Sequence, residues 1–74
     1  MKTLGEILLE NINLDKKVYL WLNGGILAVY ENVDECYKKS SYVLLTCYCE
    51  NVPLASNDID IFIKVGNFKR KFRI

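Results

Sequence analysis

The strongest local signal in the chain is VYLWL-NGG-ILAVY, residues 18–30. Two runs of aliphatic and aromatic residues, 18–22 and 26–30, flank the turn residues Asn23-Gly24-Gly25. Asn-Gly and Gly-Gly both supply the positive φ angles that a tight hairpin turn requires. The stretch therefore predicts a β-hairpin.

An amphipathic helix is predicted upstream of the hairpin. Thr3 and Glu6 have the spacing of a capping box, in which each side chain satisfies a backbone N–H group of the other. Apolar residues then recur at helical spacing, at Leu4, Ile7, Leu8 and Ile12. We expect this helix to end at about Asn13. Because it is too short to be stable alone, its apolar stripe should dock on the sheet.

Three further strands and one short helical segment are expected downstream. Residues 33–39 follow the candidate cap Asn32 and form either a short helix or a loop. Strands are expected at Ser41–Cys49, Ile59–Val65 and Phe68–Ile74, with a loop over 50–57 and a turn at Gly66-Asn67. The connection from Tyr30 to Ser41 is short for a parallel crossover, so neighbouring strands are expected to be antiparallel.

Together these elements predict a single α+β domain over residues 1–74, in the order α-β-β-(short α)-β-β-β. Its N-terminal helix is expected to pack on a four- to five-stranded antiparallel sheet. Residues 4–49, with VYLWLNG at 18–24, also resemble Sm-like small barrels. That resemblance implies an alternative fold, a small SH3/Sm-like barrel with an N-terminal helix, and with it nucleic-acid binding.

Alternation of side chains across a strand predicts which residues share a face of the sheet. One face is aliphatic and suits the helix; from the hairpin it takes Val18, Leu20, Leu22, Leu27 and Val29. Both possible turn registers of the hairpin give this division. The other face collects aromatic residues, with basic residues toward its edge. The aromatic residues are Tyr19, Trp21, Tyr30, Tyr42, Tyr48 and Phe62, and the basic ones are Lys64, Lys69, Lys71 and Arg73. The last three join this face if the Gly66-Asn67 turn is two residues long, and a longer turn would exchange the faces of the basic side chains.

Charge is unevenly distributed along the chain. Residues 1–63 contain all nine acidic and five of the ten basic residues, whereas residues 64–74 contain the other five basic residues and no acidic ones. A basic end of this kind indicates either an anionic partner or an edge strand that lysines protect from aggregation.

No catalytic, metal or cofactor site is predicted, and we expect no enzyme activity. The chain has no histidine, which removes the commonest general base and a common zinc ligand. Cys36, Cys47 and Cys49 are expected to be buried and reduced, as in a cytoplasmic protein. Asp58 is expected at the end of a loop, and Asp60 is expected to lie exposed on a strand. Neither a signal peptide nor an apolar run of about 20 residues is present, so no membrane association is expected.

Three hypotheses concern the aromatic face. In the first, the 33–39 segment, the 50–58 loop or curling of the sheet into a barrel buries the rings. In the second, the rings bind another protein or a second copy of the chain, since Tyr, Trp and Arg dominate interface hot spots. In the third, they stack on single-stranded nucleic acid. We favour a non-enzymatic protein-binding module, such as a regulator or inhibitor that a phage or mobile element encodes, with single-stranded nucleic-acid binding as the alternative.

Overall fold

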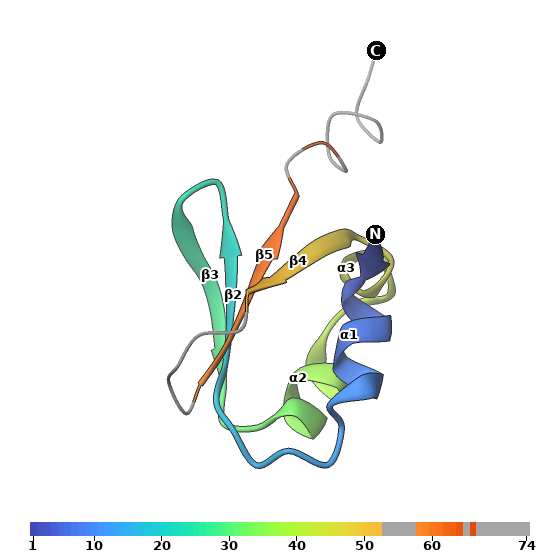
Figure 1. The fold of residues 1–74 in the computed structure, drawn as a ribbon, viewed down its shortest axis with the longest axis vertical. Helices are drawn as coiled ribbons and strands as arrows, with labels where there is room; N and C mark the ends of the chain where they lie inside the picture. The colour runs from blue at the N-terminus through green and yellow to red at the C-terminus, as the bar shows by residue number, and fades with distance from the viewer. Residues whose placement is uncertain (53–57, 65, 67–74) are drawn as a thin grey trace.

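The computed structural model describes residues 1–52, 58–64 and 66. It is a small α+β fold with an N-terminal helix and one five-stranded sheet (Figure 1). The elements in chain order are β1 (Lys2–Thr3), α1 (Leu4–Glu10), β2 (Val18–Leu22), β3 (Gly25–Tyr30), α2 (Val33–Lys39), α3 (Tyr42–Leu45), β4 (Tyr48–Val52) and β5 (Ile59–Ile63).

The sheet is mixed, with the strand order β1-β4-β5-β2-β3. Strand β5 runs antiparallel to β4 and parallel to β2, so the expectation of a purely antiparallel sheet is wrong. The connection after Tyr30 is short, but the parallel partner of β2 is β5. The chain between these two strands contains β3, α2, α3 and β4, which gives ample length for a parallel connection. In the described residues the sheet is open, with β1 and β3 as its edges, and is not a closed barrel.

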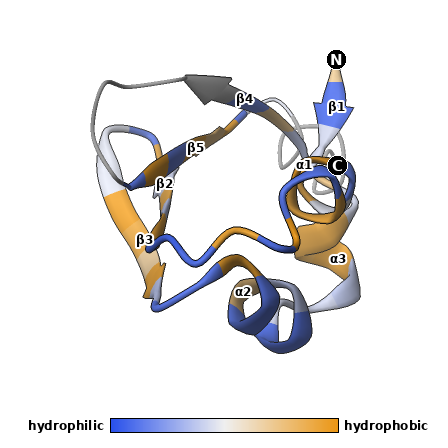
Figure 2. Cartoon of the chain, turned by 60° about the horizontal axis from the view of Figure 1, so that its bottom comes forward, coloured by the Kyte–Doolittle hydropathy of each residue, from blue (hydrophilic) through white to orange (hydrophobic). Residues whose placement is uncertain are grey.

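All three helices lie on the same side of the sheet (Figure 2). Helix α1 begins at the predicted capping box: the Glu6 backbone N–H donates to Thr3 Oγ1 at 3.3 Å, and the Thr3 N–H donates to Glu6 Oε1 at 3.1 Å. The expected docking of its apolar stripe on the sheet is confirmed. The buried core contains Leu4, Ile7, Leu8, Val18, Leu20, Val33, Cys36, Cys47, Cys49, Ile61 and Ile63.

Strands β2 and β3 form the predicted hairpin. Asn23 and Gly24 have φ angles of 50° and 82°, and two successive positive φ angles are the requirement of a type I′ turn. Strand β3 nevertheless contains one extra residue. Leu20 pairs with Ala28 and Trp21 pairs with Ile26, which leaves Leu27 as a β-bulge.

The bulge makes the predicted division of faces wrong for the second half of β3. Directly opposed residues share a face, and Val18 pairs with Tyr30 while Tyr19 pairs with Val29. Tyr30 therefore lies on the same side as the core residue Val18, and Val29 lies on the opposite side. One additional residue exchanges the faces of every residue that follows it.

The predicted strand Ser41–Cys49 is wrong in its first half. Residues Tyr42–Leu45 form α3, and the Ser41 hydroxyl caps it by accepting a hydrogen bond from the Leu44 backbone N–H at 3.2 Å. Strand β4 begins only at Tyr48 and continues through residues 50–52, which were expected in a loop. A short apolar run fits a strand and a buried helix equally well, so its pattern alone does not distinguish them.

The remaining predictions divide between confirmed elements and undescribed residues. Helix α2 confirms the helical alternative for residues 33–39, and Asn32 Oδ1 accepts from the Glu35 N–H at 2.8 Å. Strand β5 confirms the predicted strand Ile59–Val65 as far as Ile63; Lys64 lies beyond its end, and Val65 lies outside the described residues. The predicted strand Phe68–Ile74 and the rest of the predicted loop, 53–57, lie outside the described residues. Within the part of the chain described, no helix is both long and apolar enough to cross a membrane.

Candidate functional site

The candidate site is the side of the sheet that faces away from the helices, which we call the outer face. Strand register defines its members, because paired residues of neighbouring strands project on the same side. Tyr19 pairs with Val29 and with Asp60, and Trp21 pairs with Ile26 and with Phe62. Alternation along β4 and pairing with Phe62 add two further members. The outer face therefore contains Tyr19, Trp21, Ile26, Val29, Tyr48, Glu50, Asp60 and Phe62.

Apolar side chains of the outer face remain accessible to solvent. Ile26 is 53% exposed, Val29 48%, Tyr48 44% and Phe62 37%. In an antiparallel or mixed sheet covered on one side only, the other side normally alternates into polar residues. An apolar and aromatic outer face is a departure from that pattern, and it is typical of a surface that binds another molecule.

Trp21 and Phe62 form the centre of this face. Their ring centroids lie 5.7 Å apart with an interplanar angle of 20°, which is a stacked arrangement. The parallel register of β2 and β5 produces this contact by placing the two residues side by side. Tyr19 lies one pair further along the same two strands, beside Asp60.

Asp60 is held beneath these rings. Trp21 Nε1–H donates to Asp60 Oδ1 at 2.8 Å, and Asp60 is only 8% exposed, so its expected exposure on a strand is wrong. Tyr19 is its direct neighbour on β2. In the described part of the chain, Asp60 is the one buried charged residue, and no ion pair there includes it. A carboxylate removed from water needs compensating donors, and the indole N–H provides one.

A surface ion pair borders the outer face. Lys64 Nζ lies 2.7 Å from Glu50 Oε1, and Glu50 is the cross-strand partner of Phe62. An exposed pair of this kind contributes about 0–1 kcal/mol to stability. Lys64 is the one member of the predicted basic set that the structure describes; Lys69, Lys71 and Arg73 lie outside the described residues. The described outer face thus carries two carboxylates and one neighbouring ammonium group.

Four of the six predicted aromatic residues are brought together on the outer face, namely Tyr19, Trp21, Tyr48 and Phe62. Tyr30 is not among them, because the bulge turns it toward the core, where it is partly buried. Tyr42 is the first residue of α3 and is 81% exposed. Placing it on the sheet is wrong because its segment is helical.

Sequence reasoning missed Val29, Glu50 and Asp60 as members of the site. Val29 was assigned to the aliphatic face, and no residue of β3 distinguishes a bulged strand from a regular one. Glu50 was expected in a loop. Asp60 was correctly placed on the aromatic side of its strand, but its hydrogen bond with Trp21 depends on the pairing of β2 with β5, two strands far apart in the sequence.

The cysteines lie on the opposite side, within the core. Burial raises the pKa of Cys36 to about 11 and that of Cys49 to about 12. The Cys49 thiol also donates a hydrogen bond to the Cys47 carbonyl at 3.4 Å. The expected burial of all three cysteines is confirmed. At neutral pH the Cys36 and Cys49 thiols are protonated, which makes them poor nucleophiles and poor metal ligands.

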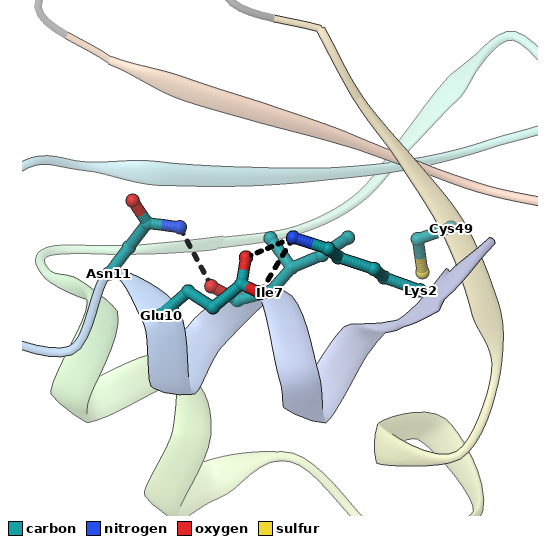
Figure 3. Close-up of a pocket in the computed structure, with 5 residues that line it drawn as sticks. All are labelled: Lys2, Ile7, Glu10, Asn11 and Cys49. Carbon is teal, nitrogen blue, oxygen red and sulfur yellow. Dashed lines mark hydrogen bonds and ion pairs between the residues drawn. The ribbon is translucent and has the colours of Figure 1, made fainter.

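A pocket of about 310 Å³ opens between α1 and strands β1 and β4 (Figure 3). Its lining residues are Lys2, Ile7, Glu10, Asn11 and Cys49. Both carboxylate oxygens of Glu10 accept from Lys2 Nζ, at 2.6 and 2.7 Å, and Asn11 Nδ2 donates to the Ile7 carbonyl at 2.7 Å. The polar groups are thus satisfied within the chain, and the Cys49 thiol is protonated.

Comparisons with known proteins give no further guidance. No family model matches the chain, and no curated protein or solved structure matches it. Among the residues that the structure describes, no group of three or more His, Cys, Asp or Glu side chains is arranged to hold a metal ion.

Proposed function

We propose that the protein is a small, non-enzymatic binding module that recognises another protein through its outer face. The observation that carries this proposal is the Trp21–Phe62 stack, which is flanked by the exposed apolar side chains of Ile26, Val29 and Tyr48. In protein interfaces, aromatic residues near the centre of the buried surface contribute much of the binding free energy.

The geometry of the face supports a protein partner. The rings project from paired strands whose backbone is hydrogen-bonded, so less conformational entropy is lost when a partner covers them than if they lay on a loop. Tyr19, Trp21 and Phe62 lie on the two central paired strands, and the charged residues Glu50 and Lys64 lie toward one side. An apolar centre with a polar rim is the usual organisation of a protein interface.

The charges of the described outer face favour protein over nucleic acid. A surface for single-stranded nucleic acid combines aromatic rings with basic groups that follow the phosphates. Here Asp60 and Glu50 lie beside the rings, and the Lys64 ammonium group is held by Glu50. A module of this kind acts by occupying its partner, as a regulator or an inhibitor does.

Site-specific photo-crosslinking tests the proposal. The photoreactive residue p-benzoylphenylalanine is placed at Phe62 on the outer face or, as a matched control, at Leu9, which is 54% exposed on α1. In cells that produce the protein, we expect a discrete crosslinked protein from position 62 and none from position 9. An excess of unlabelled protein should compete for it, and a Phe62→Glu variant should not.

Two outcomes contradict the proposal. The first is the absence of any crosslink from position 62, and the second is an equal pattern from positions 62 and 9. A single-stranded oligonucleotide serves as the probe for the alternative function. If the protein binds this oligonucleotide, and if the binding weakens steeply with added salt, the outer face recognises nucleic acid instead of a protein.

A further inference from the structure

We infer that the partner presents a cationic side chain, of the arginine type, to the Trp21–Phe62 stack beside Asp60. This inference rests on the proposed function, because it specifies the chemistry of the partner at that same surface. It follows from the burial of Asp60, from the orientation of its hydrogen bond and from the position of Glu50.

Asp60 is 8% exposed, and its carboxylate accepts a hydrogen bond from a neutral donor, Trp21. Among the described residues it takes part in no ion pair. A partner that covers the outer face removes the remaining water near this carboxylate. Without a compensating cation, that further desolvation opposes binding.

The stacked rings of Trp21 and Phe62 lie beside this carboxylate. A cation is attracted to the face of an aromatic ring, most strongly to that of tryptophan. Donation of the Trp21 N–H to a carboxylate polarises the indole and increases the electron density of its ring. Stacking extends this surface across Phe62, whose side chain is 37% exposed.

Two carboxylates, those of Asp60 and Glu50, flank Phe62. Asp60 precedes it by two residues on the same side of β5, at a spacing of about 6.6 Å, and Glu50 lies directly across from it on β4 at about 5 Å. A guanidinium group lying flat on the rings would have the Asp60 carboxylate on one side, and on the other the Glu50 carboxylate, which already binds Lys64 Nζ at 2.7 Å. Arginine fits this arrangement better than lysine, because its planar group stacks and donates hydrogen bonds at the same time.

The same charges disfavour the other occupants of the outer face. A second copy stacked face to face would bring its own Asp60 and Glu50 toward those of the first copy. Nucleic acid would bring phosphates toward them. An uncharged apolar segment would leave Asp60 buried without a cation. A basic segment of another protein is the partner whose charge complements this surface.

NMR titration with a short peptide tests the inference. The chain contains one tryptophan, so the indole Nε1–H of Trp21 gives a single resonance that reports on the site. The probe is acetyl-Gly-Arg-Gly-amide, and its matched control carries citrulline, which has the shape of arginine without the charge. We expect the arginine peptide to shift the Trp21 indole and the backbone amides of Asp60 to Phe62 in a saturable way, and the citrulline peptide to leave them in place.

Two variants assign the effect to Asp60. In Asp60→Asn the side-chain oxygen can still accept from Trp21, so the fold is kept while the charge is lost. We expect it to weaken arginine-peptide binding about fivefold or more. Asp15→Asn changes the net charge equally at an exposed position away from the face, and it should have no effect.

Equal shifts with both peptides, no shift with either, or equal weakening by the two variants would overturn the inference. The two experiments together distinguish a failure of this inference from a failure of the proposed function. If position 62 still crosslinks to a protein while the arginine peptide does not bind, the outer face is an interface whose partner is not cationic. If neither occurs, the proposed function fails as well.

Discussion

The hydrogen bond between Trp21 and Asp60 contributes both to the stability of the fold and to the geometry of the candidate site. The hydrogen bond satisfies a buried carboxylate and fixes the plane of the indole against Phe62. Each partner comes from a different strand of the parallel pair β2 and β5. Loss of either partner should therefore affect both the folded state and the geometry of the rings.

Trp21→Phe should lower the free energy of unfolding by about 1–3 kcal/mol, because it keeps an aromatic ring but leaves Asp60 buried without its donor. Urea denaturation measures the change. Tyr19→Phe is the matched control, since it removes a polar group from the neighbouring position on the same face. It should change the free energy of unfolding by no more than about 0.5 kcal/mol. Equal losses from both variants would show that the hydrogen bond does not contribute.

The buried thiols make stability depend on alkaline pH. Burial raises the pKa of Cys36 from 9.0 to about 11 and that of Cys49 to about 12. Between these values and 9.0 the folded chain keeps protons that the unfolded chain releases, so this stabilisation is complete below pH 9 and decreases as the pH rises. The urea concentration at the midpoint of unfolding should decrease when the pH is raised from 8 to 10.5. In Cys36→Ala the fall should be smaller, and an equal slope in both proteins would contradict the assignment.

At the scale of elements, local signals predicted most of the structure. The Asn23-Gly24 turn and the capping box at Thr3 act between residues close in sequence, and both occur as predicted. The α3 helix was missed because its four residues are also strand formers and only the Ser41 cap favours the helix. The pairing of β2 with β5 was missed because it depends on the docking of distant segments, for which a single sequence carries no signal.

Helix α1 is short, and its first turn depends on the capping box. Thr3→Ala should lower the free energy of unfolding by about 1 kcal/mol, because it removes the acceptor of the Glu6 backbone N–H. Thr3→Ser keeps the hydroxyl and should be nearly neutral. Thermal or urea unfolding distinguishes the two. A loss of the same size in the serine variant would mean that the threonine methyl group, not the cap, is responsible.

The bulge in β3 explains why alternation identified the candidate site only in part. Ile26 and Val29 share the outer face although they are three residues apart, because Leu27 is the additional residue between them. Deletion of Leu27 would restore regular alternation and keep Ile26 and Val29 on the outer face and Ala28 and Tyr30 on the inner face. We therefore expect the deletion variant to fold.

Circular dichroism should show cooperative thermal unfolding of the deletion variant, with a midpoint within about 5 °C of that of the parent protein. Deletion of Tyr19 is the control. Strand β2 has no extra residue to lose, so this deletion moves the residues on one side of the gap to the opposite face and should lower the midpoint further. A deletion at Leu27 that abolishes folding would contradict the bulge.

At the scale of the whole molecule, helices α1, α2 and α3 all pack on one side of the sheet (Figure 2). In the described residues their buried side chains belong to one core, and the outer face has no helical cover. A second protein that covers the outer face would explain both its exposed apolar groups and its buried carboxylate. We propose that the outer face is the surface through which the protein binds its partner.

Hydroxyl-radical footprinting tests this claim most directly, by comparing the purified protein with the same protein inside producing cells. Tyr42 is 81% exposed on α3, away from the outer face, and serves as an internal reference in every molecule. We predict that oxidation of Trp21, Tyr48 and Phe62, relative to that of Tyr42, is strongly reduced in cells. Unchanged relative oxidation of these three residues in the two settings would contradict the claim.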